Sequence, residues 1–170
     1  MAEAFNSKVL PETKAGRYAE IAREIAAVLE GEPNLTAQMA TVSAMLAQSF
    51  DRFFWTGFYV VDPERPRELV VGPYQGTLGC LRIGFGQGVC GIAAETRRTV
   101  IVADVEAFPG HIACDSRSRS EIVVPVLGQD GGLLAVLDVD STELEAFDET
   151  DAQWLERILA HAFGRNPSLT

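Results

Sequence analysis

A short polar stretch from Gly110 to Glu121 carries a thiol, an imidazole, carboxylates and two guanidinium groups just before an apolar strand. Its thiol is Cys114, and the thiolate is the form of cysteine that acts as a nucleophile. The charges of Arg117 and Arg119 could favour that thiolate. An imidazole such as His111 can activate a cysteine, but its spacing in a loop specifies no contact, and we expect a structural role for it. This stretch predicts a reactive, accessible loop.

The two other thiols, Cys80 and Cys90, lie upstream of this loop. Cys90 falls near the start of a predicted helix, where the helix dipole favours a thiolate, so electrostatics alone make it a good nucleophile. Its neighbours are small and apolar, which favours a buried structural thiol at least as strongly. Three cysteines without a Cys-x-x-Cys pair argue against a static disulfide framework.

An acidic pair, Asp138 and Asp140, lies at the end of a predicted strand. Side chains two residues apart point to the same face of a strand, so both carboxyls face one way. If they are partly buried, both cannot ionise easily, and one is pushed toward the protonated form that a general acid needs. The alternative is that the two acids are ordinary solvated charges at the exit of a strand.

Three glycines, Gly84, Gly86 and Gly88, precede the predicted helix that contains Cys90. The backbone amides of such a loop and of the following helix start form a nest for an anion such as a carboxylate. The glycine spacing departs from Gly-x-Gly-x-x-Gly, so a dinucleotide site is not indicated.

The elements that position these groups can be predicted from hydrophobic periodicity. Two amphipathic helices are predicted, from Pro11 to Leu29 and from Leu35 to Phe50, as scaffold or oligomer contacts, and we expect a homodimer. A third helix covers Val89 to Arg97, and a fourth begins after the cap residue Asp148 and precedes a tail from Arg165 to Thr170. Strands are predicted over residues 53–61, 68–73, 77–83 (with Cys80), 99–103, 122–127 and 133–140, the last two as a hairpin.

The first strand places Trp55 and Tyr59 on one face, either as core residues or as an apolar wall for a small ligand. The order of elements predicts an α+β fold, with a central antiparallel sheet flanked by helices.

The composition fits one domain spanning residues 1–170, with its core at about 15–163, because 47% of the residues are hydrophobic and 22% are charged. A net charge of −10 and a pI near 4.6 argue against nucleic-acid and anionic membrane partners. No basic leader and no apolar run of about 20 residues is present. We therefore expect a cytoplasmic protein.

Four motifs together resemble one family. They are Trp55 to Tyr59, the glycine loop ending in Gly88 to Gly91, the run from Gly110 to Asp115, and Leu137 to Ser141. In order and spacing they are similar to the free methionine-(R)-sulfoxide reductases, GAF-domain enzymes that reduce the free amino acid but not the residue in proteins. The resemblance extends from about residue 15 to residue 163.

The resemblance implies a role for each candidate residue. Cys114 would be the nucleophile and Cys80 the main resolving thiol, with Cys90 near the site and able to form a disulfide. Glu121, Asp138 and Asp140 would hold the substrate ammonium group and the sulfoxide oxygen, and Trp55 and Tyr59 would enclose the methyl group. This assignment differs from the electrostatic ranking that favoured Cys90.

The implied chemistry fits the residue types. Attack of a thiolate on the sulfoxide sulfur requires an acid that protonates the oxygen, and it leaves a cysteine sulfenic acid. A second thiol then forms a disulfide, which an external dithiol such as thioredoxin reduces, and no cofactor or metal is needed. Two alternatives are a non-catalytic GAF sensor of a small ligand, and a zinc site formed by Cys80, Cys90, Cys114 and His111, whose wide spacings are atypical of zinc sites.

Overall fold

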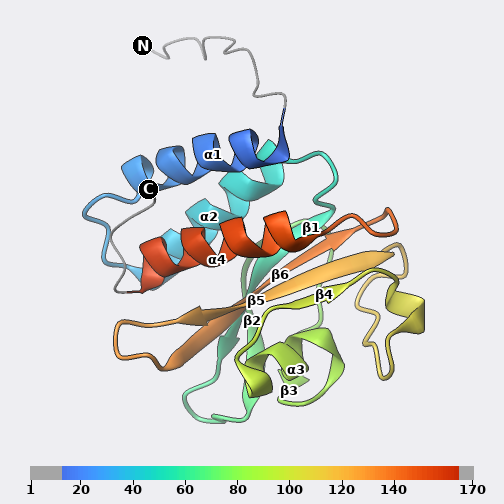
Figure 1. Ribbon diagram of the computed structural model, residues 1–170. Coiled ribbons are helices and arrows are strands. Elements are labelled where there is room, and N and C mark those ends of the chain that lie inside the picture. Colours follow the sequence, from blue (N-terminus) through green and yellow to red (C-terminus); the bar gives the residue numbers. More distant parts are fainter. Residues whose placement is uncertain (1–12, 165–170) are drawn as a thin grey trace.

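A central antiparallel sheet of six strands, in the order β3-β2-β1-β6-β5-β4, organises the fold (Figure 1). This computed structural model describes residues 13–164. The predicted helix start at Pro11 and the tail from Arg165 to Thr170 lie outside the described residues. Within them the predicted α+β class and antiparallel sheet are confirmed.

The observed elements lie close to the predicted ranges. The strands are β1 (Trp55–Val61), β2 (Glu68–Gln75), β3 (Arg82–Gly84), β4 (Val100–Val102), β5 (Ser120–Leu127) and β6 (Leu133–Ser141). The helices are α1 (Lys14–Val28), α2 (Leu35–Ser49), α3 (Gly88–Thr96) and α4 (Glu149–Phe163), with a short 3-10 turn at Val105–Ala107. As predicted, β5 and β6 form a hairpin, and Asp148 caps α4 through a capping box.

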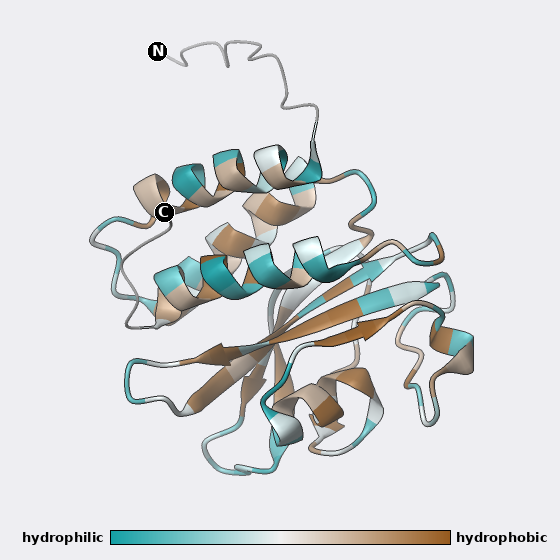
Figure 2. Ribbon diagram, viewed as in Figure 1, coloured by the Kyte–Doolittle hydropathy of each residue, from teal (hydrophilic) through white to brown (hydrophobic). Residues whose placement is uncertain are grey.

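The helices divide between the two faces of the sheet. Helices α1, α2 and α4 cover one face, and α3 lies against the other (Figure 1). Each face therefore has its own hydrophobic cluster, one containing Phe58 and Leu155 and the other containing Trp55, Tyr59 and Val123. The strands are mostly hydrophobic, whereas the outer sides of α1 and α4 are hydrophilic (Figure 2). The alternation along β1 thus places Trp55 and Tyr59 opposite Phe58, as predicted.

Two site residues lie in different elements from those expected. Cys80 was predicted within a strand over 77–83, but residues 76–81 form a loop and β3 begins only at Arg82. The loop begins at Gly76, whose φ of +126° turns the chain away from β2 in a conformation that favours glycine. Glu121 was expected in the polar loop, but it is paired with Asp140 within the sheet.

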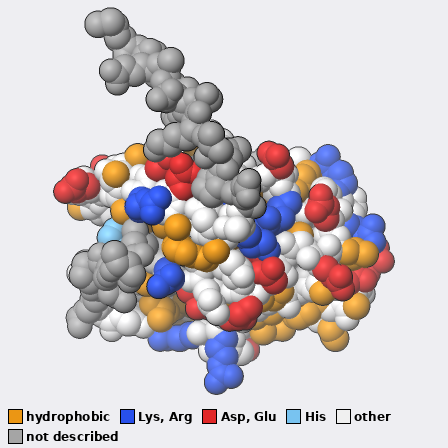
Figure 3. Space-filling model, turned by 45° about the horizontal axis from the view of Figure 1, so that its top comes forward, with side chains coloured by type: hydrophobic (Ala, Val, Ile, Leu, Met, Phe, Trp, Pro, Cys, Tyr) orange, Lys and Arg blue, Asp and Glu red, His pale blue; other side chains and the backbone are white. Residues whose placement is uncertain are grey.

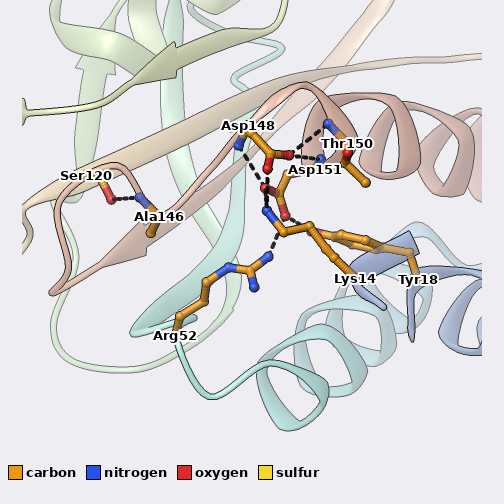
Figure 4. Close-up of polar contacts among 8 residues, drawn as sticks. All are labelled: Lys14, Tyr18, Arg52, Ser120, Ala146, Asp148, Thr150 and Asp151. Carbon is orange, nitrogen blue, oxygen red and sulfur yellow. Dashed lines mark hydrogen bonds and ion pairs between the residues drawn. The ribbon is translucent and has the colours of Figure 1, made fainter. Parts of the chain in front are cut away.

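A buried carboxylate, Asp151 at the start of α4, joins this helix to α1 and to the turn that follows α2 (Figure 4). It is fully buried and accepts hydrogen bonds from Lys14 Nζ (2.8 Å), Tyr18 Oη (2.7 Å) and Arg52. The Asp148 amide also donates to it at 2.8 Å. Because every oxygen of this carboxylate is paired, its burial is compensated and it fixes α4 against α1.

Acidic and basic side chains are interspersed over the helical face (Figure 3). Although the net charge is −10, the acidic side chains do not form a single patch on the part of the face that this view shows. Between residues 13 and 164, no helix has both the length and the apolar character required to cross a bilayer.

We predict that Asp151→Ala destabilises the protein by about 3 kcal/mol, because it leaves two cationic side chains and a tyrosine hydroxyl without their shared partner. Urea unfolding monitored by fluorescence measures the loss. Gln153→Ala, an exposed position on the same helix, is the control and should change stability by less than about 0.5 kcal/mol. An equal loss in the two variants would show that the charge cluster has no special role.

Candidate active site

A small pocket lies between the face of the sheet that α3 covers and two loops, 76–81 and 110–119. Its lining combines an aromatic wall, four acids (Asp115, Glu121, Asp138 and Asp140) and two of the three cysteines. The space within it is about 30 Å³, room for only one or two water molecules. The pocket brings together all the sequence-predicted site residues except Cys80, which is bonded to one of its lining residues.

The sheet register aligns three of these acids, Glu121, Asp138 and Asp140. Glu121 on β5 is paired with Asp140 on β6, and Asp138 lies two residues before Asp140 on the same face. Asp138 has Val123 on one side and Gly57 of β1 on the other, so it lies in the middle of the sheet. The prediction that Asp138 and Asp140 share a face is confirmed. The alternative of a solvated strand exit is wrong, because Asp138 is only 6% exposed.

Burial and mutual repulsion control the protonation of these acids. The pKa of Glu121, of Asp138 and of Asp140 is raised well above its usual range, first by burial and then by a neighbouring carboxylate. For Asp140, a hydrogen bond from Ser118 opposes part of this rise in pKa. Three such groups cannot all ionise in one pocket, which agrees with the expectation of a neutral acid.

The thiol of Cys90 lies beneath the acids, in the first turn of α3. Its sulfur is 4.0 Å from Oε1 of Glu121, and the residue is 4% exposed. Burial, followed by the charges of Asp138 and Glu121, raises the pKa of this thiol well above its usual range. The expectation that the helix dipole makes Cys90 a thiolate is therefore wrong, because burial among acids outweighs the dipole. The alternative of a buried thiol is confirmed.

The other two thiols form a disulfide between the loops. Cys80 is bonded to Cys114, with 5.3 Å between their Cα atoms. Cys114 is exposed and Cys80 half-buried, in agreement with the prediction of an accessible loop thiol. A hydrogen bond of 2.7 Å from Thr77 Oγ1 to Asp115 joins the same two loops. The disulfide also takes Cys80 and Cys114 out of the four-residue zinc set that the sequence suggested as an alternative.

The aromatic wall is both core and pocket lining. The rings of Trp55 and Tyr59 stack with centroids 5.6 Å apart, and both residues line the pocket while nearly fully buried. Gly57 between them has no room for a side chain, because a Cβ there would overlap the Cβ of Tyr74 and would lie 2.9 Å from the indole of Trp55. The indole Nε1 donates to the carbonyl of Thr77 at 2.9 Å, which fixes the loop that carries Cys80.

His111 makes a contact that the sequence did not indicate. Its Nε2 lies 3.3 Å from Oε2 of Glu121, and its side chain is 14% exposed at the wall of the pocket. Burial lowers the pKa of the imidazole and raises that of the carboxyl, so a neutral pair sharing one proton is favoured. Spacing gave no signal for this contact, because the two residues lie in a loop and a strand.

Arg117 is placed differently from expectation. Arg117 pairs with Asp115 at 2.9 Å and lies over the ring of Phe54, so it serves the loop and not the Cys114 sulfur. This pairing holds the pKa of Asp115 well below its usual range. Arg119 has a buried Nε without a hydrogen-bond partner.

This fold and site define a class of protein. The GAF domain family matches residues 34–162, which is most of the chain, and the chain belongs to that family. The chain is 50% identical over 147 residues to GAF domain-containing protein A of Dictyostelium discoideum, covering 86% of this chain and 90% of the relative.

Two further comparisons identify the branch of the family. The chain is 41% identical to the free methionine-R-sulfoxide reductase of Saccharomyces cerevisiae, over 76% of this chain and 74% of the relative. The free methionine-R-sulfoxide reductase of Neisseria meningitidis, solved in complex with its substrate, is 47% identical and superposes with a TM-score of 0.85 over 89% of each chain. The chain belongs to the free methionine-R-sulfoxide reductases, a family of oxidoreductases, as its sequence motifs predicted.

The raised pKa of Asp138 gives a testable pH dependence. A raised folded-state pKa contributes stability that is fully present below the ordinary value of 3.8 and is lost as the pH rises through the folded value. We predict that Asp138→Asn reduces the fall in unfolding free energy between about pH 5 and pH 8 by at least about 1 kcal/mol. Asp51→Asn, at an exposed position, is the matched control. Parallel pH profiles for parent and Asp138→Asn would contradict the proposed repulsion.

Proposed function

We propose that this protein reduces free L-methionine-(R)-sulfoxide to L-methionine, with Cys114 as the nucleophile and Cys80 as the resolving thiol. The observation that carries the proposal is the disulfide between these two residues at a pocket of buried acids. The substrate complex of the Neisseria meningitidis relative supports the choice of substrate.

The proposed reaction begins with attack of the Cys114 thiolate on the substrate sulfur. A carboxylic acid of the cluster protonates the sulfoxide oxygen, which is transferred to Cys114 as methionine leaves. Cys114 is thereby oxidised to a sulfenic acid and the sulfoxide is reduced to a thioether. The Cys80 thiol then attacks the sulfenic sulfur, water leaves with the substrate oxygen, and the disulfide forms.

The acid cluster gives this reaction its proton and its preference for a free amino acid. We assign to Glu121, Asp138 and Asp140 the binding of the substrate ammonium group and of the sulfoxide oxygen. Buried carboxylates are costly unless a cation compensates them, and the α-ammonium group is such a cation. A methionine residue within a peptide lacks that charge. The stacked rings of Trp55 and Tyr59 would enclose the methyl group.

The glycine-rich loop supplies a candidate site for the substrate carboxylate. Gln87 precedes α3 without a side-chain hydrogen bond to the helix start, and Gln87, Gly88 and Val89 line the pocket. The amides of this first turn are thus free of a side-chain cap, and the helix dipole favours an anion beside them.

A change of loop conformation must accompany turnover. The 30 Å³ of the pocket is far below the roughly 300–1,000 Å³ of typical ligand sites. The loops 76–81 and 110–119 are joined by the disulfide and by the bond from Thr77 to Asp115. We infer that reduction of the disulfide lets residues 110–119 move away and admit the substrate.

Regeneration of the two thiols requires an external dithiol, because a thiolate must attack one sulfur of the disulfide and release the other. We propose thioredoxin as this dithiol.

The proposed compartment is the cytoplasm, because such reductants keep thiols reduced there. A homodimer stays a prediction.

We predict that Cys114→Ser abolishes reduction of the free R-sulfoxide. Cys80→Ser should still form one methionine per enzyme, because the first step needs only Cys114, and should then turn over poorly with thioredoxin. Single-turnover and thioredoxin-coupled assays measure the two steps. Activity of Cys114→Ser equal to the parent would defeat the assignment. If the parent protein bound the sulfoxide without reducing it, the alternative of a non-catalytic GAF sensor would be favoured.

Substrate selection provides a second test. N-acetylation of methionine-(R)-sulfoxide removes the ammonium charge, and we expect kcat/KM to fall at least about 30-fold, as for loss of one partner of a buried charge pair. The free S-sulfoxide and a peptide-bound R-sulfoxide are the companion substrates, and both should be turned over poorly. Similar kcat/KM values for acetylated and free substrate would refute recognition by the acids.

A further inference from the structure

The proposed reaction leaves one reactive group of the pocket without a necessary task. Cys90 is the free thiol among the described residues, and the disulfide that the reaction requires forms without it. Its sulfur and one carboxylate oxygen from each of Glu121 and Asp138 all lie within 4.8 Å of one another. These side chains come from α3, β5 and β6, so regular secondary structure holds all three.

This cluster lacks a compensating cation. Oδ1 of Asp138 is buried and has no hydrogen-bond partner, although the residue is only 6% exposed and lines the pocket. Among residues 13–164, no lysine or arginine forms an ion pair with Glu121, Asp138 or Asp140, and His111 lies 3.3 Å from Glu121. A buried carboxylate that has an unpaired oxygen and lies beside a thiol and a second carboxylate is typical of a site that awaits a positive ligand.

We infer that Cys90, Glu121 and Asp138 bind one thiophilic divalent cation of the Zn²⁺ class. Tetrahedral Zn²⁺ with a thiolate at about 2.3 Å and a carboxylate oxygen at about 2.1 Å separates those two donors by about 3.6 Å. The observed sulfur-to-oxygen distance for Cys90 and Glu121 is 4.0 Å, so small side-chain movements suffice. His111 lies beside the other oxygen of Glu121 at 3.3 Å, outside the set of three ligand atoms, so water would complete the tetrahedral coordination.

The donor set selects the kind of cation. A thiolate ligand favours Zn²⁺, Co²⁺ and similar ions over Mg²⁺ and Ca²⁺, which prefer oxygen ligands alone. Binding replaces the proton of the Cys90 thiol and any protons on the two carboxyls, which are released to solvent without oxidation or reduction. The affinity should therefore increase with pH.

Occupancy of the site would have a consequence for catalysis, and this consequence alone rests on the proposed function. The cation would occupy the region that we assign to the substrate ammonium group. It would therefore compete with the substrate and make the reductase reversibly sensitive to Zn²⁺.

Cobalt titration of the disulfide-bonded protein tests the site, because Cys80 and Cys114 cannot act as ligands in that state. We expect a thiolate-to-cobalt charge-transfer absorption that saturates at one equivalent, is displaced by Zn²⁺, and is unaffected by Mg²⁺. Cys90→Ser should abolish the absorption. Asp138→Asn should weaken binding at least about 10-fold, and the remote surface variant Asp130→Asn should leave it unchanged.

Each alternative result is decisive. The absence of a charge-transfer absorption in the parent, or its persistence in a folded Cys90→Ser variant, would overturn the inference. Near-ultraviolet circular dichroism shows whether Cys90→Ser folds. If it does not fold, the inference is tested by whether the parent shows the absorption and whether Asp138→Asn weakens cobalt binding.

The catalytic arm separates the inference from the proposed function. Single-turnover assays of Cys80→Ser with Zn²⁺ should show an increased apparent KM and an unchanged rate at saturating substrate. A protein that binds Co²⁺ but reduces no sulfoxide would retain the metal site and reject the proposed function. An active enzyme without cobalt absorption would reject the metal site alone.

Discussion

The energetic cost of placing three carboxyls and a thiol in one nearly dry pocket is the constraint on which the site depends. Two unit charges 4 Å apart repel by about 4 kcal/mol at an effective dielectric constant of 20, so full ionisation of Glu121, Asp138 and Asp140 is strongly unfavourable. The pocket must therefore retain protons or acquire a cation. A neutral acid can donate a proton to a departing oxygen, and an ammonium group or a metal ion can take the place of a proton. The cost of ionising the cluster therefore underlies the proposed acid catalysis, the proposed binding of the substrate ammonium group and the proposed metal site.

The fold keeps this unfavourable arrangement in place by dividing the site between rigid and movable parts. Glu121 and Asp140 are paired across adjacent strands, and Asp138 lies between β1 and β5, so ladder hydrogen bonds fix the backbone that carries all three acids. The two thiols that we propose to react, Cys80 and Cys114, are instead on loops, which a disulfide joins. Fixed acids beside a loop thiol suit a reaction in which the nucleophile must reach the substrate and then a second thiol.

Features that depend on the periodicity of a single segment could be predicted from the sequence. Alternation along β6 placed Asp138 and Asp140 on one face, and the polar run around Cys114 indicated an exposed thiol. Features that depend on packing between distant segments could not be predicted. The burial that raises the pKa of Cys90 arises from the contact of α3 with the sheet, and the contact between His111 and Glu121 joins a loop to a strand. The loop around Cys80 was mistaken for a strand because its apolar residues resemble one.

Carboxyl protonation in the reduced protein tests the central claim most directly. With ¹³C-labelled aspartate and glutamate side chains, the carboxyl resonances of Glu121, Asp138 and Asp140 can be assigned by substitution and followed with pH. The account predicts that at least one of the three remains protonated at pH 7 in the unliganded reduced protein. Three fully ionised carboxylates at pH 7 in the unliganded reduced protein would contradict it.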